Sequence, residues 1–247
     1  LPFVQNIMDY MEAFSPEQIR DLYSIFANLS LSAMRAPGAS LPEDDHIHIL
    51  LRKQLSHAEL KYKRMGILGA TAMVACFGKL DEQSAAEATE VSPSVAQVSA
   101  ERYKFVEETL ELVLTHCTGN PHCMAFAYDE LSLTFDTLGE KIDTRIVDFM
   151  YHKVSEDFEE SYLADLEEEG VLNPAALPDI SLKSDSWMSL DGKNAVIIIN
   201  LLPMAASKLT TDQDTLLVCC SLFRLLVTTT RLTTGSVTEI DAVLGCP

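Results

Sequence analysis

Helix start signals, each followed by apolar residues three or four positions apart, recur along this chain and constrain its fold more than any other feature. Ser15-Pro16-Glu17 places a capping residue before a proline at the first helical position, and Asn120-Pro121 repeats the pattern. Ser99 and Asp143 each precede a further apolar stripe with helical spacing. Roughly eight to ten helices are expected, with no convincing strand order. We therefore predict an all-α fold, an irregular α-helical solenoid of antiparallel helix pairs, because no strict repeat period is present.

Length and composition agree with one extended helical body. The chain has 247 residues, is 47% hydrophobic and contains only 10 glycines and 10 prolines. We predict one solenoid segment over residues 1–247, with flexible loops at about 80–98 and 163–193, where there is little to bury. Residues 196–202 are ambiguous between a strand and a buried helix. Because no run of eighteen apolar residues occurs, we expect no membrane span. The chain lacks a signal-peptide pattern and an initiator methionine and stops at Cys246-Pro247 just after an apolar segment, so we expect an excised piece of a longer protein.

One predicted helix carries a lysine within its apolar stripe. Ser56 and Glu59 have the spacing of a capping box, which predicts a helix from near His57 to about Phe77. The stripe along one face consists of Leu60, Lys63, Ile67, Ala70 and Val74. A buried ammonium is costly unless it is paired or its stem carries the charge to water. From spacing alone, Lys63 is either an ordinary snorkelling side chain or a functional one, and both interpretations stay open.

Two glycines lie in the same helix. Gly66 and Gly69 each cost about 1 kcal/mol relative to alanine in a helix interior. Glycine at such a position usually allows another backbone or helix to come close. The pair indicates a tight helix contact inside the fold or, alternatively, a close-packed surface on either side of Lys63.

The charge is strongly acidic but unevenly distributed. Eighteen basic residues against 37 acidic ones give a formal net charge of −19, which does not favour nucleic-acid binding by bulk electrostatics. A local basic cluster, however, contains Arg52, Lys53, Lys61, Lys63 and Arg64. Such a cluster is either a solvated face or a docking site for a partner.

No catalytic, cofactor or metal motif stands out. Glycine-rich phosphate loops, nucleophile elbows and helical zinc-protease motifs are all absent from the sequence. His116-Cys117 and His122-Cys123 lack the spacing of structural zinc pairs and indicate a helix end, a turn and a helix start. We therefore expect no metal, no cofactor and no enzyme activity. Six scattered cysteines favour a reducing compartment, the cytosol or the nucleus.

Several segments resemble one known family. Residues 61–70, Lys-Tyr-Lys-Arg-Met-Gly-Ile-Leu-Gly-Ala, with Met73, resemble the ubiquitin-acceptor helix of the Fanconi anaemia group D2 family. The other matching segments occur in the same order as in the family: residues 51–56, 128–131, Asp191-Gly192, 199–203, 223–226, 239–241, Leu244 and Cys246-Pro247. Residues 80–98 and 163–190 show no such match.

The resemblance implies a function that composition does not. The family is an irregular helical solenoid of the nucleus that pairs with its paralogue, the Fanconi anaemia group I protein, and closes around double-stranded DNA in interstrand crosslink repair. One lysine accepts a single ubiquitin from the ligase of the Fanconi core complex and its conjugating enzyme. The matching position here is Lys63, with Lys61 as the fallback, and Arg52, Lys53, Lys61 and Arg64 are candidate contacts to partner or DNA. The alternative is a generic α-solenoid interaction scaffold without modification.

Overall fold

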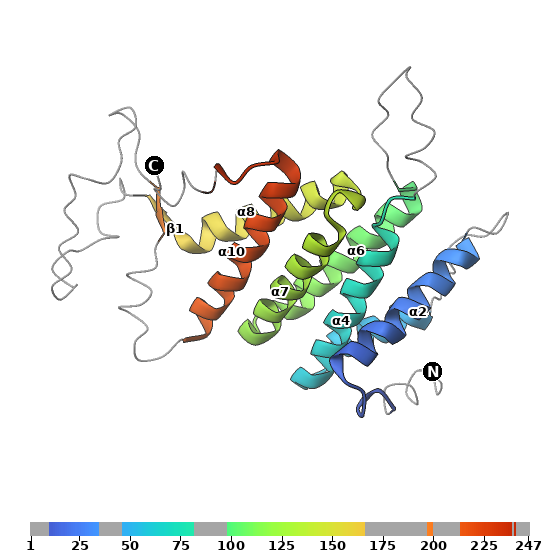
Figure 1. Cartoon of the computed structure of the whole chain (residues 1–247). Coiled ribbons are helices and arrows are strands. Elements are labelled where there is room, and N and C mark those ends of the chain that lie inside the picture. The colour runs from blue at the N-terminus through green and yellow to red at the C-terminus, as the bar shows by residue number, and fades with distance from the viewer. Residues whose placement is uncertain are drawn as a thin grey trace, which may run out of the picture.

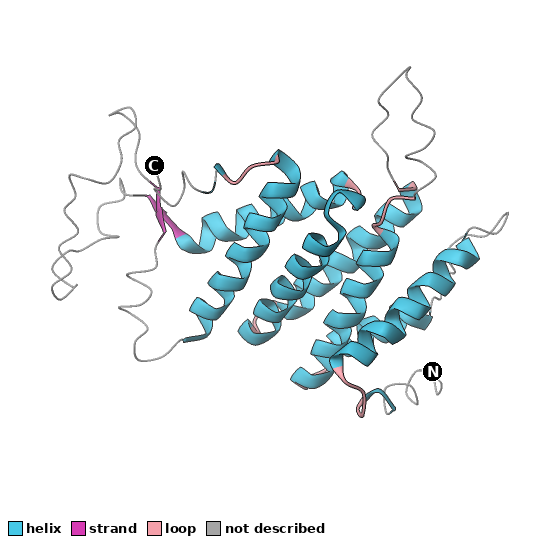
Figure 2. Cartoon of the chain, viewed as in Figure 1, coloured by secondary structure: helices cyan, strands magenta, loops and turns pink. Residues whose placement is uncertain are grey.

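The computed structural model describes residues 10–34, 46–81, 98–165, 197–199, 213–238 and 240. Helices dominate this part of the chain, as Figure 2 shows. The elements are α2 (Pro16–Met34), α3 (His46–Leu55), α4 (Leu60–Phe77), α6 (Ala100–Cys117), α7 (Pro121–Leu138), the 3-10 turn η1 (Gly139–Lys141), α8 (Thr144–Tyr162), β1 (Leu163–Asp165), β2 (Ile197–Ile199) and α10 (Gln213–Thr234).

Most helix starts follow from the capping residues in the sequence. The Ser15 hydroxyl accepts from the Gln18 N–H at 3.3 Å, and the Gln18 side chain accepts from the Ser15 N–H, which is a reciprocal capping box. The Ser99 hydroxyl caps α6 through the Arg102 N–H, and the Asn120 side chain caps α7 through the Cys123 N–H. These predicted starts are confirmed.

The helices pack around two of their number, α4 and α7. α4 contacts α2, α3, α6 and α7, while α10 packs against both α7 and α8 (Figure 1). Helices that are not consecutive, such as α2 and α4 or α7 and α10, therefore pack together, and α7 links the group around α4 to α10. The prediction of an all-α fold is confirmed.

The glycines of α4 mark close helix contacts inside this body. A Cβ atom on Gly69 would lie 2.6 Å from Cζ of Tyr23 and 2.7 Å from Cδ2 of Leu51. A Cβ on Gly66 would lie 2.9 Å from Cγ of Leu55. Of the two interpretations that the sequence left open, the tight internal contact is therefore the one observed, with α2 and α3 as the approaching helices.

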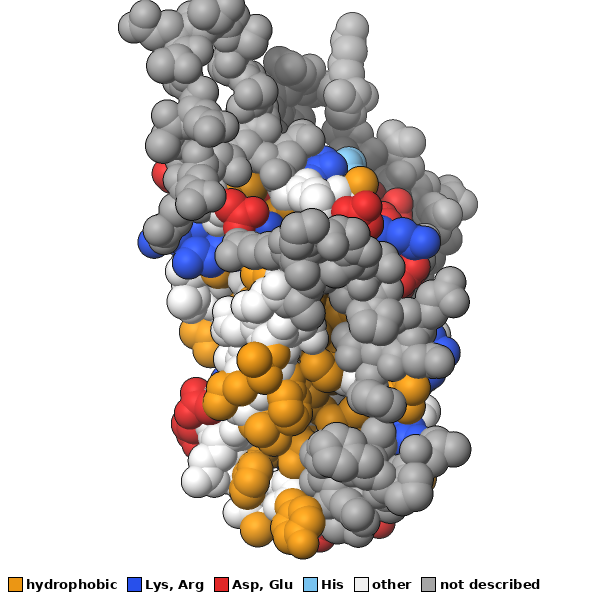
Figure 3. Space-filling view, turned by 90° about the vertical axis from the view of Figure 1, so that its right-hand side faces the viewer, with side chains coloured by type: hydrophobic (Ala, Val, Ile, Leu, Met, Phe, Trp, Pro, Cys, Tyr) orange, Lys and Arg blue, Asp and Glu red, His pale blue; other side chains and the backbone are white. Residues whose placement is uncertain are grey.

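The outer face of α2 exposes two large apolar side chains. Tyr23 and Ala27 are fully buried, whereas Ile25 and Leu29 on the opposite side are 57% and 63% exposed. Figure 3 shows hydrophobic side chains gathered in the lower half of this face of the molecule. α2 thus carries large apolar side chains on its outer side too, among polar residues such as Asp21 and Asn28.

Two short strands depart from the purely helical expectation. β1 and β2 pair antiparallel, with Leu163 opposite Ile199, so part of the ambiguous 196–202 segment is a strand. The predicted loop at 163–193 is wrong at its first three residues, which form β1 and gain ladder hydrogen bonds. Residues 166–196 and 82–97, which hold most of both predicted loops, lie outside the described residues.

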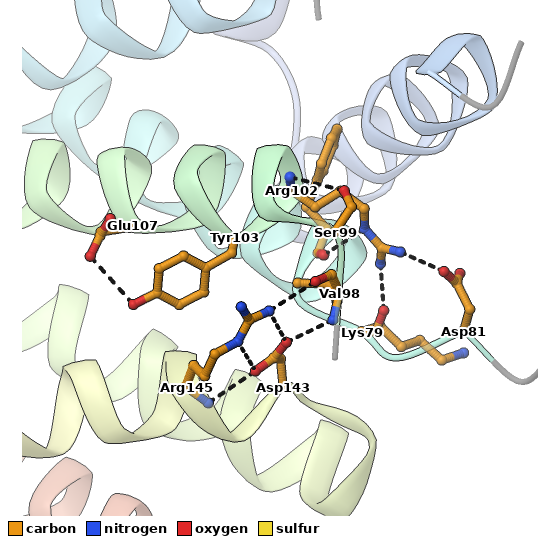
Figure 4. Close-up of polar contacts among 10 residues, drawn as sticks. Lys79, Asp81, Val98, Ser99, Arg102, Tyr103, Glu107, Asp143 and Arg145 are labelled. Atoms are coloured by element: carbon orange, nitrogen blue, oxygen red, sulfur yellow. Dashed lines mark hydrogen bonds and ion pairs between the residues drawn. The ribbon is translucent and has the colours of Figure 1, made fainter. Parts of the chain in front are cut away.

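A polar cluster holds the chain on both sides of residues 82–97 (Figure 4). On the one side, Arg102 donates to the Phe77 carbonyl at 3.0 Å and to the Lys79 carbonyl, and forms an ion pair of 2.7 Å with Asp81. On the other, the Val98 carbonyl accepts from Arg145 at 2.8 Å. Since Arg102 is only 5% exposed, these contacts satisfy a charge that burial would otherwise penalise.

One helix satisfies a length-and-composition test for a membrane span. Among the described residues this is the stretch Leu217–Thr234 of α10. Core helices pass the same test, and α10 buries Leu222 and Leu225 where it packs on α7 and α8.

Candidate functional site

α4 begins at Leu60, one turn later than its sequence predicts. Ser56 does not cap it, because the Ser56 hydroxyl donates to the Lys53 carbonyl at 3.2 Å and so ends α3 instead. Glu59 occupies the N-cap position without a side-chain cap, and its N–H donates to Nδ1 of His57 at 3.0 Å. The predicted start near His57 is therefore wrong, while the predicted end at Phe77 is confirmed.

The apolar stripe of α4 deepens from its first turn onward. Leu60 and Lys63 are half-buried, whereas Ile67, Ala70 and Val74 are at most 1% exposed. From Met65 to Val74 every residue of the helix is buried, because four helices surround it. Lys63 thus lies at the outer end of the stripe, where its stem packs and its amine reaches the edge of the core.

The Lys63 amine is bound by the end of another helix. Its Nζ donates to the His116 backbone carbonyl in the last turn of α6, at 2.6 Å. The last carbonyls of a helix have no partners within it and carry the negative end of its dipole, so a cation is favoured there. Lys63 therefore acts as a C-terminal cap for α6.

Two buried thiols lie behind this contact. Cys117 ends α6 and Cys123 lies in the first turn of α7, and both are 0% exposed. Burial raises the pKa of the Cys117 thiol to about 12, with Cys123 adding to the rise and the Lys63 ammonium opposing it. At neutral pH both thiols are protonated and behave as small apolar groups.

The neighbours of Lys63 contact other parts of the fold. Lys61 forms an ion pair of 3.5 Å with Glu12, and the Tyr62 hydroxyl donates to the same carboxylate. The Arg64 guanidinium lies over the Phe126 ring of α7, 5.8 Å from its centroid. The first turn of α4 is therefore fixed through four successive side chains.

The predicted basic residues lie at one end of the α3–α4 pair. Arg52 and Lys53 belong to the last turn of α3, Lys61 and Arg64 to the first turns of α4, and only residues 56–59 separate the two helices. Arg52, Lys61 and Arg64 are exposed, while Lys53 is half-buried. The structure thus brings the candidates to one end of the helix pair.

The partners of these residues were not predicted from sequence. Glu12, Phe126 and the His116 carbonyl are each about fifty residues or more from the α4 side chain that they contact. In the sequence, His116 stands out only as a potential metal ligand, a role that the spacing of the His-Cys pairs does not favour. Residues 116–123 instead form a helix end, a turn and a helix start, as expected, and the described residues contain no group of three or more His, Cys, Asp or Glu that could hold a metal ion.

Comparisons with known proteins point to one family. Residues 1–247 match the family described as "Fanconi anaemia protein FancD2 nuclease". The Fanconi anemia group D2 protein homolog of Rattus norvegicus is 30% identical over 262 residues, and that of Mus musculus is 30% identical over 266. The Fanconi anemia group D2 protein of Gallus gallus is 31% identical over 259 residues. Each alignment covers 99% of this chain but 17% of the relative, so the chain spans about a sixth of their length.

Proposed function

The chain belongs to the Fanconi anaemia group D2 family, and on that basis we propose that it is a scaffold segment in DNA interstrand crosslink repair that accepts a single ubiquitin on Lys63. The ubiquitin comes from the ligase of the Fanconi core complex and its conjugating enzyme. The full-length protein pairs with the Fanconi anaemia group I paralogue in the nucleus and clamps double-stranded DNA with it.

The position of Lys63 is the observation that supports this role best. Its stem is packed at the edge of the core, so the amine is held at a defined place on a rigid helix. Lys61, the fallback acceptor, is 49% exposed and bound to the exposed Glu12. Because the two amines differ in their surroundings, a partner that covers or reshapes this face changes the access to each differently.

The basic end of the α3–α4 pair suits an acidic partner surface or DNA held in the clamp. Arg52 is exposed, and Arg64 presents its guanidinium beside Phe126. With a net charge of −19, this segment offers few phosphate contacts, so most DNA binding falls to other parts of the full-length protein or to the paralogue.

Reconstituted conjugation tests the acceptor. The full-length protein is incubated with ubiquitin, the ligase and conjugating enzyme, the paralogue and DNA, and K63R is compared with K61R. K63R should abolish the singly conjugated product, while K61R should retain it. Loss in K61R alone would assign the fallback lysine. If neither the wild type nor either variant forms a singly conjugated product, the generic scaffold without modification would be favoured.

Charge reversal tests the basic end separately. We expect R52E/K53E to weaken the stimulation of conjugation by DNA or paralogue, because like charge then faces the acidic partner. K104E serves as the control, since Lys104 is exposed on α6 and pairs with Glu108 at 3.7 Å. Unchanged stimulation in R52E/K53E would refute this contact.

The matched family description contains the word nuclease, but our proposal assigns this segment no cleavage chemistry. Metal-dependent phosphodiester cleavage requires convergent ligands around the ion. A nuclease assay of the same preparation with Mg²⁺ or Mn²⁺ is the direct check, and turnover lost on substituting a residue of this chain would overturn that assignment.

A further inference from the structure

We propose that the C-terminal turn of α6 is an intramolecular latch that holds the Lys63 amine out of reaction until α4 and α6 separate locally. The latch consists of Lys63 Nζ and the His116 carbonyl, 2.6 Å apart. Its regulatory meaning rests on the proposed acceptor role, whereas its existence does not.

The geometry provides a specific binding site for an ammonium group. Near the end of α6 the Leu114 carbonyl already accepts from the N–H and hydroxyl of Thr118, and the Cys117 carbonyl accepts from the Asn120 N–H. The His116 carbonyl takes its hydrogen bond from Lys63. Releasing Lys63 therefore leaves a carbonyl at a partly buried helix end without this partner, which costs free energy.

The chemistry of conjugation requires that release. The amine must lose a proton and direct its lone pair at the carbonyl carbon of the ubiquitin thioester. The new bond joins Nζ to that carbon, the carbon–sulfur bond breaks, the departing sulfur takes one proton to become the enzyme's thiol, and one proton goes to solvent. The ammonium has three N–H donors and no lone pair, and the contact with the His116 carbonyl fixes Nζ at the end of α6, so local release is what lets the amine reorient toward an acyl donor.

Lys61, two residues earlier on the same helix, shows what the latch contributes. Lys61 pairs at 3.5 Å with a carboxylate that is itself 44% exposed, a contact that water competes with readily. Lys63 is bound at 2.6 Å in a partly buried setting beside two buried thiols. The latch therefore makes the proposed acceptor the less reactive of the two in the resting fold, and conjugation depends on opening it.

Thr118 offers a way to open the latch without changing either partner. The φ of Thr118 is −52°, which proline can adopt. Proline there removes the N–H that bonds the Leu114 carbonyl at 3.1 Å, and it disfavours the helical conformation of Cys117. T118P should thus unwind the last turn of α6 and displace the His116 carbonyl. T118A is the matched control, because it loses the hydroxyl and keeps the N–H.

The test is acylation of the full-length protein by an N-hydroxysuccinimide ester, with the rate at each lysine read by mass spectrometry and no ubiquitin enzymes present. We expect Lys63 to react about tenfold more slowly than Lys104, because a hydrogen bond to a charged group must open first. Lys104 is 73% exposed. T118P should remove most of this difference, and T118A should keep it.

Equal rates at Lys63 and Lys104 in the wild type would overturn the latch, as would a slow Lys63 in a folded T118P. If circular dichroism shows that T118P does not fold, the wild-type comparison decides alone. The two proposals fail separately: a slow Lys63 together with normal conjugation of K63R keeps the latch and removes the acceptor role.

Discussion

The carboxylate of Asp143 accepts a hydrogen bond from the Val98 N–H at 2.7 Å, across 45 residues of chain. The same carboxylate binds the Arg145 guanidinium at 2.7 Å, and Asp143 is completely buried. Burial raises the pKa of Asp143, but Arg145 and the N–H groups of Val98 and Arg145 outweigh it and lower the pKa overall. The start of α8 and the segment that leads into α6 are thereby joined.

D143N should weaken this junction. Asparagine keeps the size but removes the charge, so Arg145 loses its ion pair; we expect a loss of about 2 kcal/mol. The measurement is the local opening free energy of α8 and of the α6 start by hydrogen exchange. D129N is the control, since Asp129 and Arg224 are exposed and their pair is worth at most about 1 kcal/mol. Equal losses in the two variants would contradict the assigned role of Asp143.

G69A should destabilise the contact between α4 and its neighbours by about 1–3 kcal/mol, despite the better helix propensity of alanine. The added methyl would meet Tyr23 and Leu51, both fully buried and unable to move aside cheaply. G66A should cost less, because its nearest atom is 2.9 Å away rather than 2.6 Å. Hydrogen exchange of α2 and α4 ranks the two, and a G69A protein as stable as wild type would be inconsistent with this packing.

Cys117 should resist alkylation while Cys220, which is exposed, reacts. The thiolate is the reactive form, and the pKa of Cys117 is raised to about 12 by burial. Iodoacetamide labelling against pH, read by mass spectrometry, should therefore show Cys117 lagging behind Cys220. Rapid labelling of Cys117 near neutral pH would disprove its burial.

Because burial raises the pKa of the Cys117 thiol, the free energy of unfolding also depends on pH. The unfolded thiol releases its proton near 9.0 and the folded one only near 12, so the unfolded state binds fewer protons between them. The stability that the buried Cys117 thiol contributes to the fold is thus complete below pH 9.0 and is lost as pH rises toward 12. The difference in unfolding temperature between wild type and C117A should follow that course. If the stability advantage of the wild type over C117A grew as pH rose, the predicted direction of the pH dependence would be wrong.

Sequence alone predicted what local chemistry determines. Ser15, Ser99 and Asn120 cap their helices as expected, because a capping hydrogen bond involves residues only three apart. The same rule failed at Ser56, whose hydroxyl was taken by the preceding helix. A capping box is ambiguous wherever one helix ends within a turn of the next.

The site could be predicted only in part. The spacing put Lys63 within an apolar stripe, where a core side chain is expected, and the structure half-buries it at the outer end of that stripe. Its partner could not be predicted, because the His116 carbonyl belongs to a backbone 53 residues away and is brought near only by helix packing. A main-chain acceptor has no side-chain signature in a sequence.

The most direct test of the central claim is peptide mapping of the singly ubiquitinated full-length protein. After tryptic digestion, our account predicts the diglycine remnant of ubiquitin on the peptide that contains Lys63, with Lys61 unmodified. A remnant on Lys61 or on a lysine outside α4, with Lys63 free, would contradict it.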